Sequence, residues 1–183
     1  MWGDHLKGVR LANIEDVNAM SFIHAQTWKS AYTEYISYEY LNNITDEGWI
    51  PLFCRAFVQK LHEAAVFELD GILTGTVTFG RGRIITTCTI ADMSTQDKNS
   101  CCQIISLYVL PQYWSTKQGY ELTKFALERL KSQGYKSCYL WVIKENERAV
   151  NFYKRFGFKS TNEHTTVMLA ENAVIEEKYI IYF

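Results

Sequence analysis

Two segments of the sequence hold residue types that could bind or transform a ligand. Residues 114–119, WSTKQG, form a polar loop between an apolar run and an amphipathic segment. A helix that starts after a strand presents unpaired backbone N–H groups and a positive dipole end, which suits a phosphate group. The second segment combines the amide of Asn146 with the phenol of Tyr153. Spacing alone leaves both open, because most such connections bind nothing and a tyrosine on an apolar helix face is usually a core residue.

The first third of the chain, which must position part of any site, is predicted to be mainly helical. A short strand is expected at residues 9–11, after which Asn13 can cap a helix with Asp16 in its first turn. Apolar and aromatic residues at helical spacing predict two further helices, over residues 30–41 and 49–62.

Strands and helices alternate in the remainder. Residues 64–69 and 72–79, joined by Asp70-Gly71, predict a hairpin. Asn146 is expected to cap a helix that ends at Gly157, in the left-handed position, with Phe158 as its hydrophobic contact. An amphipathic helix is predicted over 119–131, and strands over 84–90, 103–110, 138–143, 165–169 and 178–183. This order predicts an α/β protein with a mixed sheet and helices on its faces.

Composition excludes several classes of protein. The 183 residues are about the length of one domain, and a hydrophobic fraction of 48% excludes disorder. A net charge of −1 offers no field for nucleic acid or an anionic membrane. No apolar run approaches the roughly 20 residues of a membrane helix. The N-terminus has no apolar secretion signal, so a cytoplasmic protein is expected.

The five cysteines are an odd number with no repeated spacing. In a cytoplasmic protein this pattern favours reduced, buried thiols over a metal or redox site. No metal site is predicted.

Residues 146–158 carry the most specific pattern, Asn-x-x-Ala-x-x-Phe-Tyr-x-x-x-Gly-Phe. Together with residues 107–130, the hairpin over 66–79 and the segments 9–12 and 28–41, it resembles the GNAT superfamily of N-acetyltransferases over about residues 9–158. The resemblance implies a single GNAT-like acetyltransferase domain over residues 1–183. Its fold is that of acyl-CoA N-acyltransferases: a central, mostly antiparallel sheet with flanking helices and a splayed parallel pair, here residues 104–110 and 138–143.

The resemblance also implies acetyl-CoA as co-substrate. The pantetheine arm would pair with the strand backbone at Leu107 and Val109, and the pyrophosphate would lie on the loop and the helix start behind it. The cofactor-binding residues implied are Leu107, Tyr108, Val109, Trp114, Ser115, Thr116, Lys117, Gln118, Gly119, Tyr120 and Asn146.

The loop departs from the family pattern of Gln or Arg, two residues, Gly, one residue, and Gly or Ala. Trp114 stands in place of Gln or Arg, Lys117 in place of the first Gly, and only Gly119 is kept. Glycine permits positive φ and close approach of a phosphate, so Lys117 must either adopt a strained backbone or reshape the loop. Its ammonium could pair with the phosphate.

For the transfer itself, the resemblance makes Tyr153 the general acid toward the cofactor sulfur and the Val109 N–H the oxyanion donor. Many members carry a carboxylate base near the position of Gln103, and glutamine cannot accept a proton. Glu34, Glu39, His24 or a chain of waters could replace it, although a packed histidine is the simpler interpretation of His24.

Trp28, Tyr32 and Tyr35 fall on one face of a helix in the region where the family binds its acceptor. They are either core residues or an aromatic wall that would favour an aromatic or cationic acceptor. Residues 80–100, with Arg81, Arg83, Asp92 and Asp97, could cover the acceptor end or be only a solvated loop.

These observations predict an N-acetyltransferase that moves an acetyl group from acetyl-CoA to a primary amine on a small molecule or peptide, directly within a ternary complex. No acetyl-cysteine intermediate is expected. A homodimer is possible, as the family is often dimeric. The alternative is a non-catalytic GNAT-fold acyl-CoA sensor or protein-interaction module, which the changes at Gln103, Trp114 and Lys117 favour.

Overall fold

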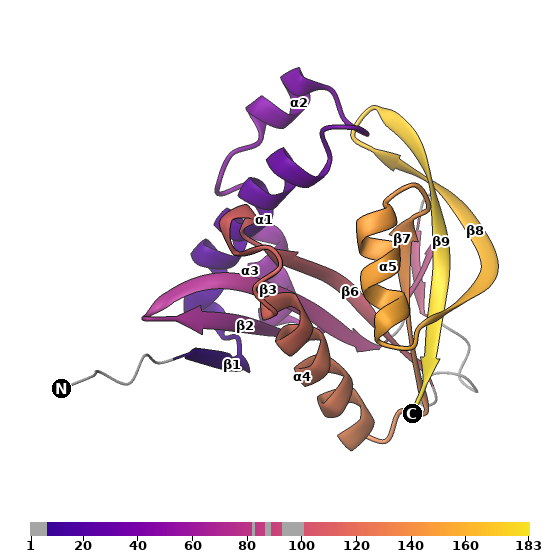
Figure 1. Ribbon diagram of the computed structural model, residues 1–183. Coiled ribbons are helices and arrows are strands. Elements are labelled where there is room, and N and C mark those ends of the chain that lie inside the picture. The colour runs from indigo at the N-terminus through magenta and orange to yellow at the C-terminus, as the bar shows by residue number, and fades with distance from the viewer. Residues whose placement is uncertain (1–6, 82, 87–88, 93–100) are drawn as a thin grey trace. The chain divides into compact units, whose positions relative to one another are not determined.

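The computed structural model describes residues 7–81, 83–86, 89–92 and 101–183 (Figure 1). The chain divides into two compact units. The first runs to Phe79 and resumes at Ser106–Leu127, and the second comprises Gly80–Ile105 and Glu128–Phe183. Seven of the described strands are hydrogen-bonded in the order β1-β2-β3-β6-β7-β9-β8, and β4 and β5 form a separate ladder. The mixed sheet predicted from the sequence is confirmed.

The first unit contains β1 (Lys7–Leu11), β2 (Glu63–Leu69) and β3 (Ile72–Arg81, whose last residues belong to the second unit), which pair antiparallel in sequence order. The predicted hairpin is confirmed. Asp70 and Gly71 have φ of 52° and 79°, the positive values that a tight turn between twisted strands needs.

The first long helix, α1 (Val17–Ala31), follows a single 3-10 turn, Ile14–Asp16. Asn13 caps this turn as predicted, since its side chain accepts from the Glu15 N–H while Asp16 accepts from the Asn13 N–H. The Arg10 guanidinium binds both oxygens of Asp16 at 2.8 Å, which holds the pKa of that carboxyl below its usual value. The pair fixes the start of α1 to β1.

The prediction of a helix over residues 30–41 is wrong in its extent. The α1 helix ends at Ala31, and a separate short helix, α2 (Tyr38–Asn43), follows a turn. The reason is Ser37, whose extended backbone and side-chain oxygen, bonded to the Tyr40 N–H at 3.3 Å, start a new helix. The third helix, α3 (Ile50–Val58), is confirmed but shorter than the predicted 49–62.

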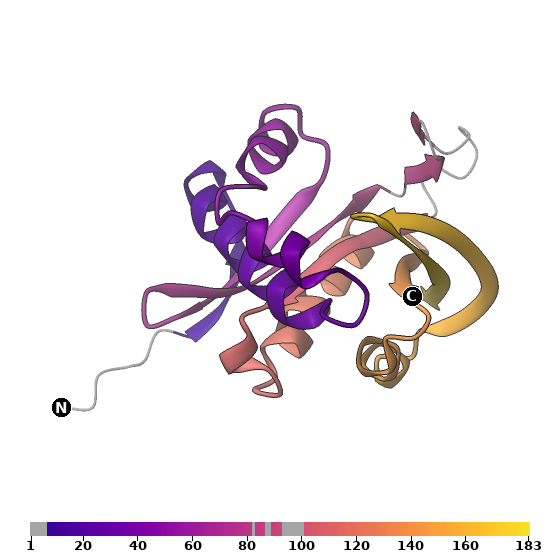
Figure 2. The ribbon, with the colours of Figure 1, turned by 90° about the horizontal axis from the view of Figure 1, so that it is seen from above.

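Helices lie on both faces of β2 and β3 (Figure 2). On one face Val17 and Met20 of α1 and Phe53 of α3 pack with Ala64 and Val66 in a buried cluster. On the other face lies α4 (Gln118–Ser132), which matches the helix predicted over 119–131. Its Leu122 is fully buried against Gly75 of β3.

The next strand of the sheet after β3 is β6 (Cys101–Val109), which contributes residues to both units. It ends shortly before Pro111, as predicted. In the second unit its first residues pair in parallel with β7 (Ser137–Ile143). This ladder joins Cys101 to Ser137, Cys102 to Cys138 and Gln103 to Tyr139, and among the described residues it extends no further.

The second unit also holds α5 (Glu147–Arg155), β8 (Lys159–Leu169) and β9 (Asn172–Tyr182). The predicted end of α5 is confirmed: Gly157 has φ of 94°, its N–H donates to the Lys154 carbonyl, and the Phe158 N–H donates to the Tyr153 carbonyl. Both closing strands are confirmed and are longer than predicted. The β-like stretch within 84–90 is two short strands, β4 (Arg83–Thr86) and β5 (Thr89–Asp92).

The prediction of buried thiols holds for two of the four cysteines that the structure describes. Cys102 and Cys138 are fully buried, Cys54 and Cys101 are half-buried, and none of these four is in a disulfide, while Cys88 lies outside the described residues. In the part of the chain that the structure covers, no helix combines the length and apolar character needed to cross a bilayer.

Candidate active site

The loop between β6 and α4 takes the strained form of the two that the sequence allows. Lys117 has φ of 70°, and Ser115 has φ of 65°, both in the left-handed region that non-glycine residues rarely adopt. Before them lies a 3-10 turn, Pro111–Tyr113. The loop therefore keeps a backbone for which the family uses glycine.

Backbone donors accumulate at the end of this loop. The N–H groups of Ser115, Lys117, Gln118 and Gly119 have no hydrogen-bond acceptor among the described residues. The last two belong to the first turn of α4, where the helix dipole is positive. A set of such donors can bind the oxygens of a phosphate group without any glycine side chain being required.

Three side chains of the loop form hydrogen bonds within the protein. The Trp114 indole N–H donates to the Val109 carbonyl at 2.7 Å, and Thr116 Oγ1 donates to the Tyr113 carbonyl at 2.6 Å. Gln118 is buried, and its Oε1 accepts from Thr74 Oγ1 at 2.7 Å. Lys117 and Tyr120 are exposed. The side chains of Trp114 and Gln118 are thus engaged within the protein, and the backbone is the part of these residues that would face a ligand.

The end of β6 presents alternate backbone groups to opposite sides. The Leu110 N–H donates to the Thr74 carbonyl of β3 at 2.9 Å. Because successive residues of a strand alternate, the backbone groups of Leu107 and Val109 point away from β3. The Val109 carbonyl is bound there by Trp114 and, at 3.2 Å, by Thr27 Oγ1. Leu107 and Val109 thus offer their N–H groups on the side where an extended ligand could pair.

Trp28, Tyr32 and Tyr35, predicted as one face, are brought together by the end of α1 and the turn that follows it. Ring centroids of Trp28 and Tyr32 are 4.9 Å apart and those of Tyr32 and Tyr35 are 6.3 Å apart, both near-perpendicular. All three side chains are half-buried. They therefore combine contact with the core and contact with solvent.

The sequence did not anticipate that Tyr108 belongs to the same cluster. Its hydroxyl accepts from the Trp28 indole at 3.1 Å and lies 3.2 Å from the Tyr32 hydroxyl. The only signal was alternation along β6, which turns Tyr108 to the opposite face from Leu107 and Val109. Tyr108 joins the strand that carries the implied cofactor contacts to the implied acceptor residues.

His24 lies beneath this cluster and is fully enclosed. Its ring is 4.3 Å from that of Tyr108 and 4.9 Å from that of Phe53, and its Nε2 has no hydrogen-bond partner among the described residues. Burial lowers the pKa of His24 to about 3. So weak a base would take up almost no proton at neutral pH, which leaves Glu34, Glu39 or water as the candidates, and both glutamates are exposed.

Gln103 lies in the second unit at the last rung of the β6–β7 ladder. Its Oε1 accepts from the buried Tyr139 hydroxyl at 3.2 Å, and Lys178 Nζ stands 5.2 Å from the centre of the Tyr139 ring. The position thus holds a neutral hydrogen-bonded pair.

Tyr153 and Asn146 lie on α5 and at its start. The Asn146 side chain accepts from the Ala149 N–H at 3.0 Å and so caps the helix. The half-buried Tyr153 ring packs edge-on against Phe152 at 5.2 Å and Phe158 at 5.8 Å. These contacts fix the ring of Tyr153 with respect to its own helix. Of the predicted acceptor-side segment, Asp97 and the side chains of Arg83 and Asp92 lie outside the residues described.

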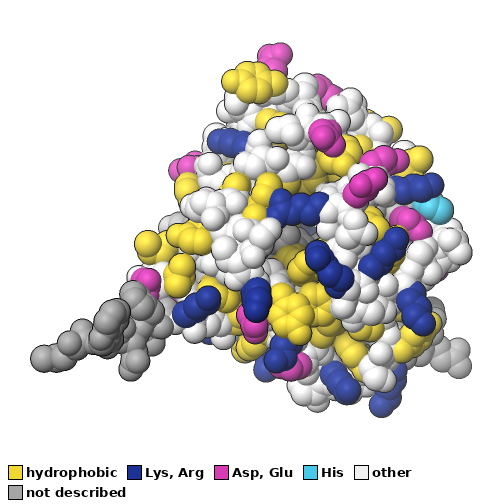
Figure 3. Space-filling view, in the orientation of Figure 1, with side chains coloured by type: hydrophobic (Ala, Val, Ile, Leu, Met, Phe, Trp, Pro, Cys, Tyr) yellow, Lys and Arg dark blue, Asp and Glu magenta, His cyan; other side chains and the backbone are white. Residues whose placement is uncertain are grey.

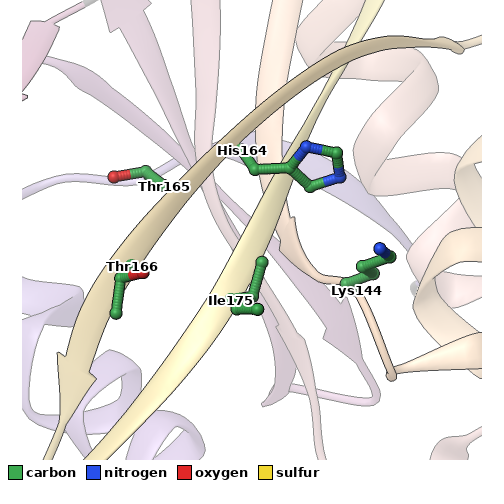
Figure 4. A pocket seen from close by; sticks show the side chains of 5 residues that line it. All are labelled: Lys144, His164, Thr165, Thr166 and Ile175. Carbon is green, nitrogen blue, oxygen red and sulfur yellow. The ribbon is translucent and has the colours of Figure 1, made fainter.

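The second unit also has a shallow hollow of about 200 Å³ lined by Lys144, His164, Thr165, Thr166 and Ile175 (Figure 4). His164 and Lys144 lie on the same side of the strands, and Thr165 points the other way. The hollow shares no residue with the predicted site. The face drawn in Figure 3 carries both basic and acidic side chains.

Comparison with known proteins decides the family. The profile described as acetyltransferase (GNAT) family matches residues 25–158, which is well over half of the chain. The chain belongs to the GNAT family. It is therefore a member of a family of acetyl-CoA-dependent N-acetyltransferases, and the resemblance in the sequence is confirmed.

The GNAT chain has distant relatives that cover most of its length. It is 25% identical over 174 residues to a spermidine N(1)-acetyltransferase of Thermoplasma acidophilum. The aligned region covers 93% of this chain and 96% of the relative. It is 24% identical over 153 residues to the uncharacterised N-acetyltransferase YuaI of Bacillus subtilis, over 81% of this chain and 78% of the relative.

Solved structures share the GNAT fold. An N-acetyltransferase of Staphylococcus aureus superposes with a TM-score of 0.72 at 19% identity, over 97% of this chain and 98% of the other. The PaiA N-acetyltransferase of Thermoplasma acidophilum, solved in complex with coenzyme A, gives 0.65 at 22% identity, over 95% and 99%. The predicted fold class is confirmed.

Proposed function

We propose that this chain transfers an acetyl group from acetyl-CoA to a primary amine of an acceptor that carries a second positive charge, directly within a ternary complex. The observation that carries the proposal is the set of unpaired N–H groups at Ser115, Lys117, Gln118 and Gly119 in a member of the GNAT family. These donors suit the pyrophosphate of coenzyme A.

The cofactor side would be formed mainly by backbone. Acetyl-CoA supplies the activated acetyl thioester when it is bound. The N–H groups of Leu107 and Val109, which point away from β3, would pair with the amides of the pantetheine arm in the manner of an added strand. Exposed Lys117 would add a charge beside the phosphates.

The chemical step needs an oxyanion donor and an acid. The amine nitrogen would attack the thioester carbonyl, so that a C–N bond forms, the C–S bond breaks and the electron pair of that bond passes to sulfur. The Val109 N–H would donate to the carbonyl oxygen as negative charge develops. The Tyr153 hydroxyl would give its proton to the departing sulfur. Because Gln103 and His24 are unsuited to act as bases, Glu34, Glu39 or water would take up the amine proton.

The acceptor would lie against the aromatic cluster of Trp28, Tyr32, Tyr35 and Tyr108. Half-buried aromatic rings attract an alkylammonium group through their faces, at about 0.5–2 kcal/mol for each good contact. The similarity to a spermidine N(1)-acetyltransferase supports an acceptor of the polyamine class.

Two measurements test this proposal. Calorimetric titration with acetyl-CoA should give micromolar binding that weakens with dephospho-CoA. Release of coenzyme A should then be faster with 1,6-diaminohexane or spermidine than with hexylamine, which has the reacting amine but no second charge. Tyr32→Leu should reduce kcat/KM for the diamine more than for hexylamine.

The opposite outcomes are equally informative. Absence of binding at millimolar acetyl-CoA would overturn the enzymatic proposal. Micromolar binding without turnover of any amine would favour the second candidate, a non-catalytic acyl-CoA sensor, for which the neutral Gln103–Tyr139 pair is the supporting observation. Equal rates with the diamine and hexylamine would contradict the polyamine class alone.

A further inference from the structure

The loop that would bind the phosphates holds its backbone in an unfavourable conformation without glycine. Ser115 and Lys117 both have positive φ, at 65° and 70°. Such conformations persist only where the surroundings enforce them. The side chains that fix the two ends of the loop are therefore the features that the conformation depends on.

At the start of the loop, Trp114 binds back to β6. Its indole N–H donates to the Val109 carbonyl at 2.7 Å, and the buried Thr27 of α1 donates to the same oxygen at 3.2 Å. The other end of that peptide unit is also held, because the Leu110 N–H donates to the Thr74 carbonyl at 2.9 Å. Trp114 thus ties the loop to a peptide that is fixed on both sides.

At the end of the loop, Gln118 binds to β3. Its Oε1 accepts from Thr74 Oγ1 at 2.7 Å, and both side chains are buried. Thr74 therefore fixes the two ends of the loop at once, with its carbonyl at Leu110 and its hydroxyl at Gln118. Ser115 and Lys117 lie between these two attachments.

We propose that Trp114 and Gln118 are positioning residues that hold the Ser115–Lys117 backbone in its phosphate-binding conformation and so replace the glycine of the usual motif. The inference rests on the proposed function, since the ligand is the pyrophosphate of coenzyme A. It concerns side chains that touch the protein rather than the ligand.

The first test is Trp114→Phe, which keeps an aromatic ring and removes the indole N–H. The dissociation constant of coenzyme A, measured by calorimetry, is expected to rise about tenfold, on the net value of one hydrogen bond. With a suitable amine, KM for acetyl-CoA should rise while kcat changes little. Trp49→Phe, a half-buried tryptophan of the same unit outside the loop, should leave the affinity for coenzyme A unchanged.

The second test separates conformation from charge at Lys117. Glycine adopts φ of 70° without strain and alanine does not, while both lack the ammonium. Trp114→Phe with Lys117→Gly should therefore recover most of the affinity lost in Trp114→Phe, and Trp114→Phe with Lys117→Ala should not. Each pair is compared with its Lys117 single variant, so that the coupling is read from a double-mutant cycle.

Thr74→Val tests the other attachment without touching Trp114. It should weaken coenzyme A binding, and thermal unfolding of each variant without ligand should show one intact transition. Wild-type protein that fails to bind coenzyme A would defeat the proposed function. Two results would overturn this inference alone, provided that the wild-type protein binds coenzyme A. One is a dissociation constant of Trp114→Phe within twofold of the wild-type value. The other is equal recovery of affinity by Lys117→Gly and Lys117→Ala in the Trp114→Phe background.

Discussion

Tyr153, the proposed general acid, is the residue at which a test can separate catalysis from binding. Tyr153→Phe keeps the ring that packs on Phe152 and Phe158 and removes the hydroxyl. Loss of a general acid typically lowers kcat by about 10²–10⁴-fold, so a reduction in this range is expected with an unchanged dissociation constant for acetyl-CoA. Steady-state kinetics and calorimetry measure the two quantities. Tyr182→Phe, an exposed tyrosine on β9, is the matched control, and unaltered turnover in Tyr153→Phe would remove it from the mechanism.

The burial of His24 is expected to make the stability of the protein depend on pH. Burial lowers its pKa to about 3 in the folded state, whereas an unfolded histidine titrates near about 6.5. Between these values the unfolded chain binds a proton that the folded one does not, so the free energy of unfolding should fall by up to about 1.4 kcal/mol per unit as pH decreases below about 6.5. The stabilisation by Asp16, whose pKa is lowered, is lost only below about 3.9, the ordinary value for aspartate.

Urea unfolding of wild type and His24→Phe between about pH 6.5 and 4.5 measures this effect. This window lies below the ordinary pKa of histidine, about 6.5, and above that of aspartate, about 3.9. The variant should have the flatter profile, because phenylalanine fits an aromatic surrounding and does not titrate. Parallel profiles for the two proteins would show that His24 is not the group responsible.

At the level of single residues, the sequence was informative where the determinant is local. Asn13 and Asn146 were predicted to cap the starts of helical segments, and Gly157 was predicted to follow the end of one. The structure confirms all three roles. The bond between Trp28 and Tyr108 joins residues 80 positions apart in the chain and depends on how β6 lies against α1. No local pattern contains that information.

Among the elements, β3 and α4 are packed closely together at Gly75. A Cβ added at Gly75 would lie 2.9 Å from Leu122 Cδ1, 3.2 Å from Val109 Cγ2 and 3.3 Å from the Tyr108 carbonyl oxygen. Gly75→Ala should therefore lower the free energy of unfolding by about 1–3 kcal/mol, the usual cost of overpacking. Gly8→Ala on β1, where no atom lies within 4 Å, should change it by less than about 0.5 kcal/mol. Chemical denaturation of both variants checks this, and equal stabilities would indicate that α4 can yield.

The elements also show where periodicity misleads. Tyrosines recur through residues 30–41 and predicted one helix, yet α1 ends at Ala31 and Ser37 begins a separate helix, because its side-chain oxygen competes with the backbone for the first N–H groups. The hairpin at Asp70-Gly71 was predictable for the opposite reason. Its turn chemistry and the apolar strands around it favour the same structure.

For the whole molecule, the order of elements predicted a mixed α/β sheet, and the resemblance to the GNAT family supplied the particular fold. The family match over residues 25–158 extends through parts of both units. The candidate site was predictable only in outline. Motif and spacing predicted a role for the loop, Tyr153 and the aromatic face, and these roles stay predictions. The bonds of Thr74, Gln118 and Trp114 depend on three elements meeting, and hence on the complete fold.

The short parallel ladder between β6 and β7 has one further consequence. It places the buried thiols of Cys102 and Cys138 on neighbouring strands in register, and burial together with the adjacent Cys102 thiol raises the pKa of Cys138 well above its usual value. The thiolate is the nucleophile that reacts with thiol reagents, and both sulfurs are buried, so Cys102 and Cys138 should stay unmodified while the ladder is closed. The rate at which a thiol reagent labels Cys102 and Cys138 would therefore report how often the second unit opens.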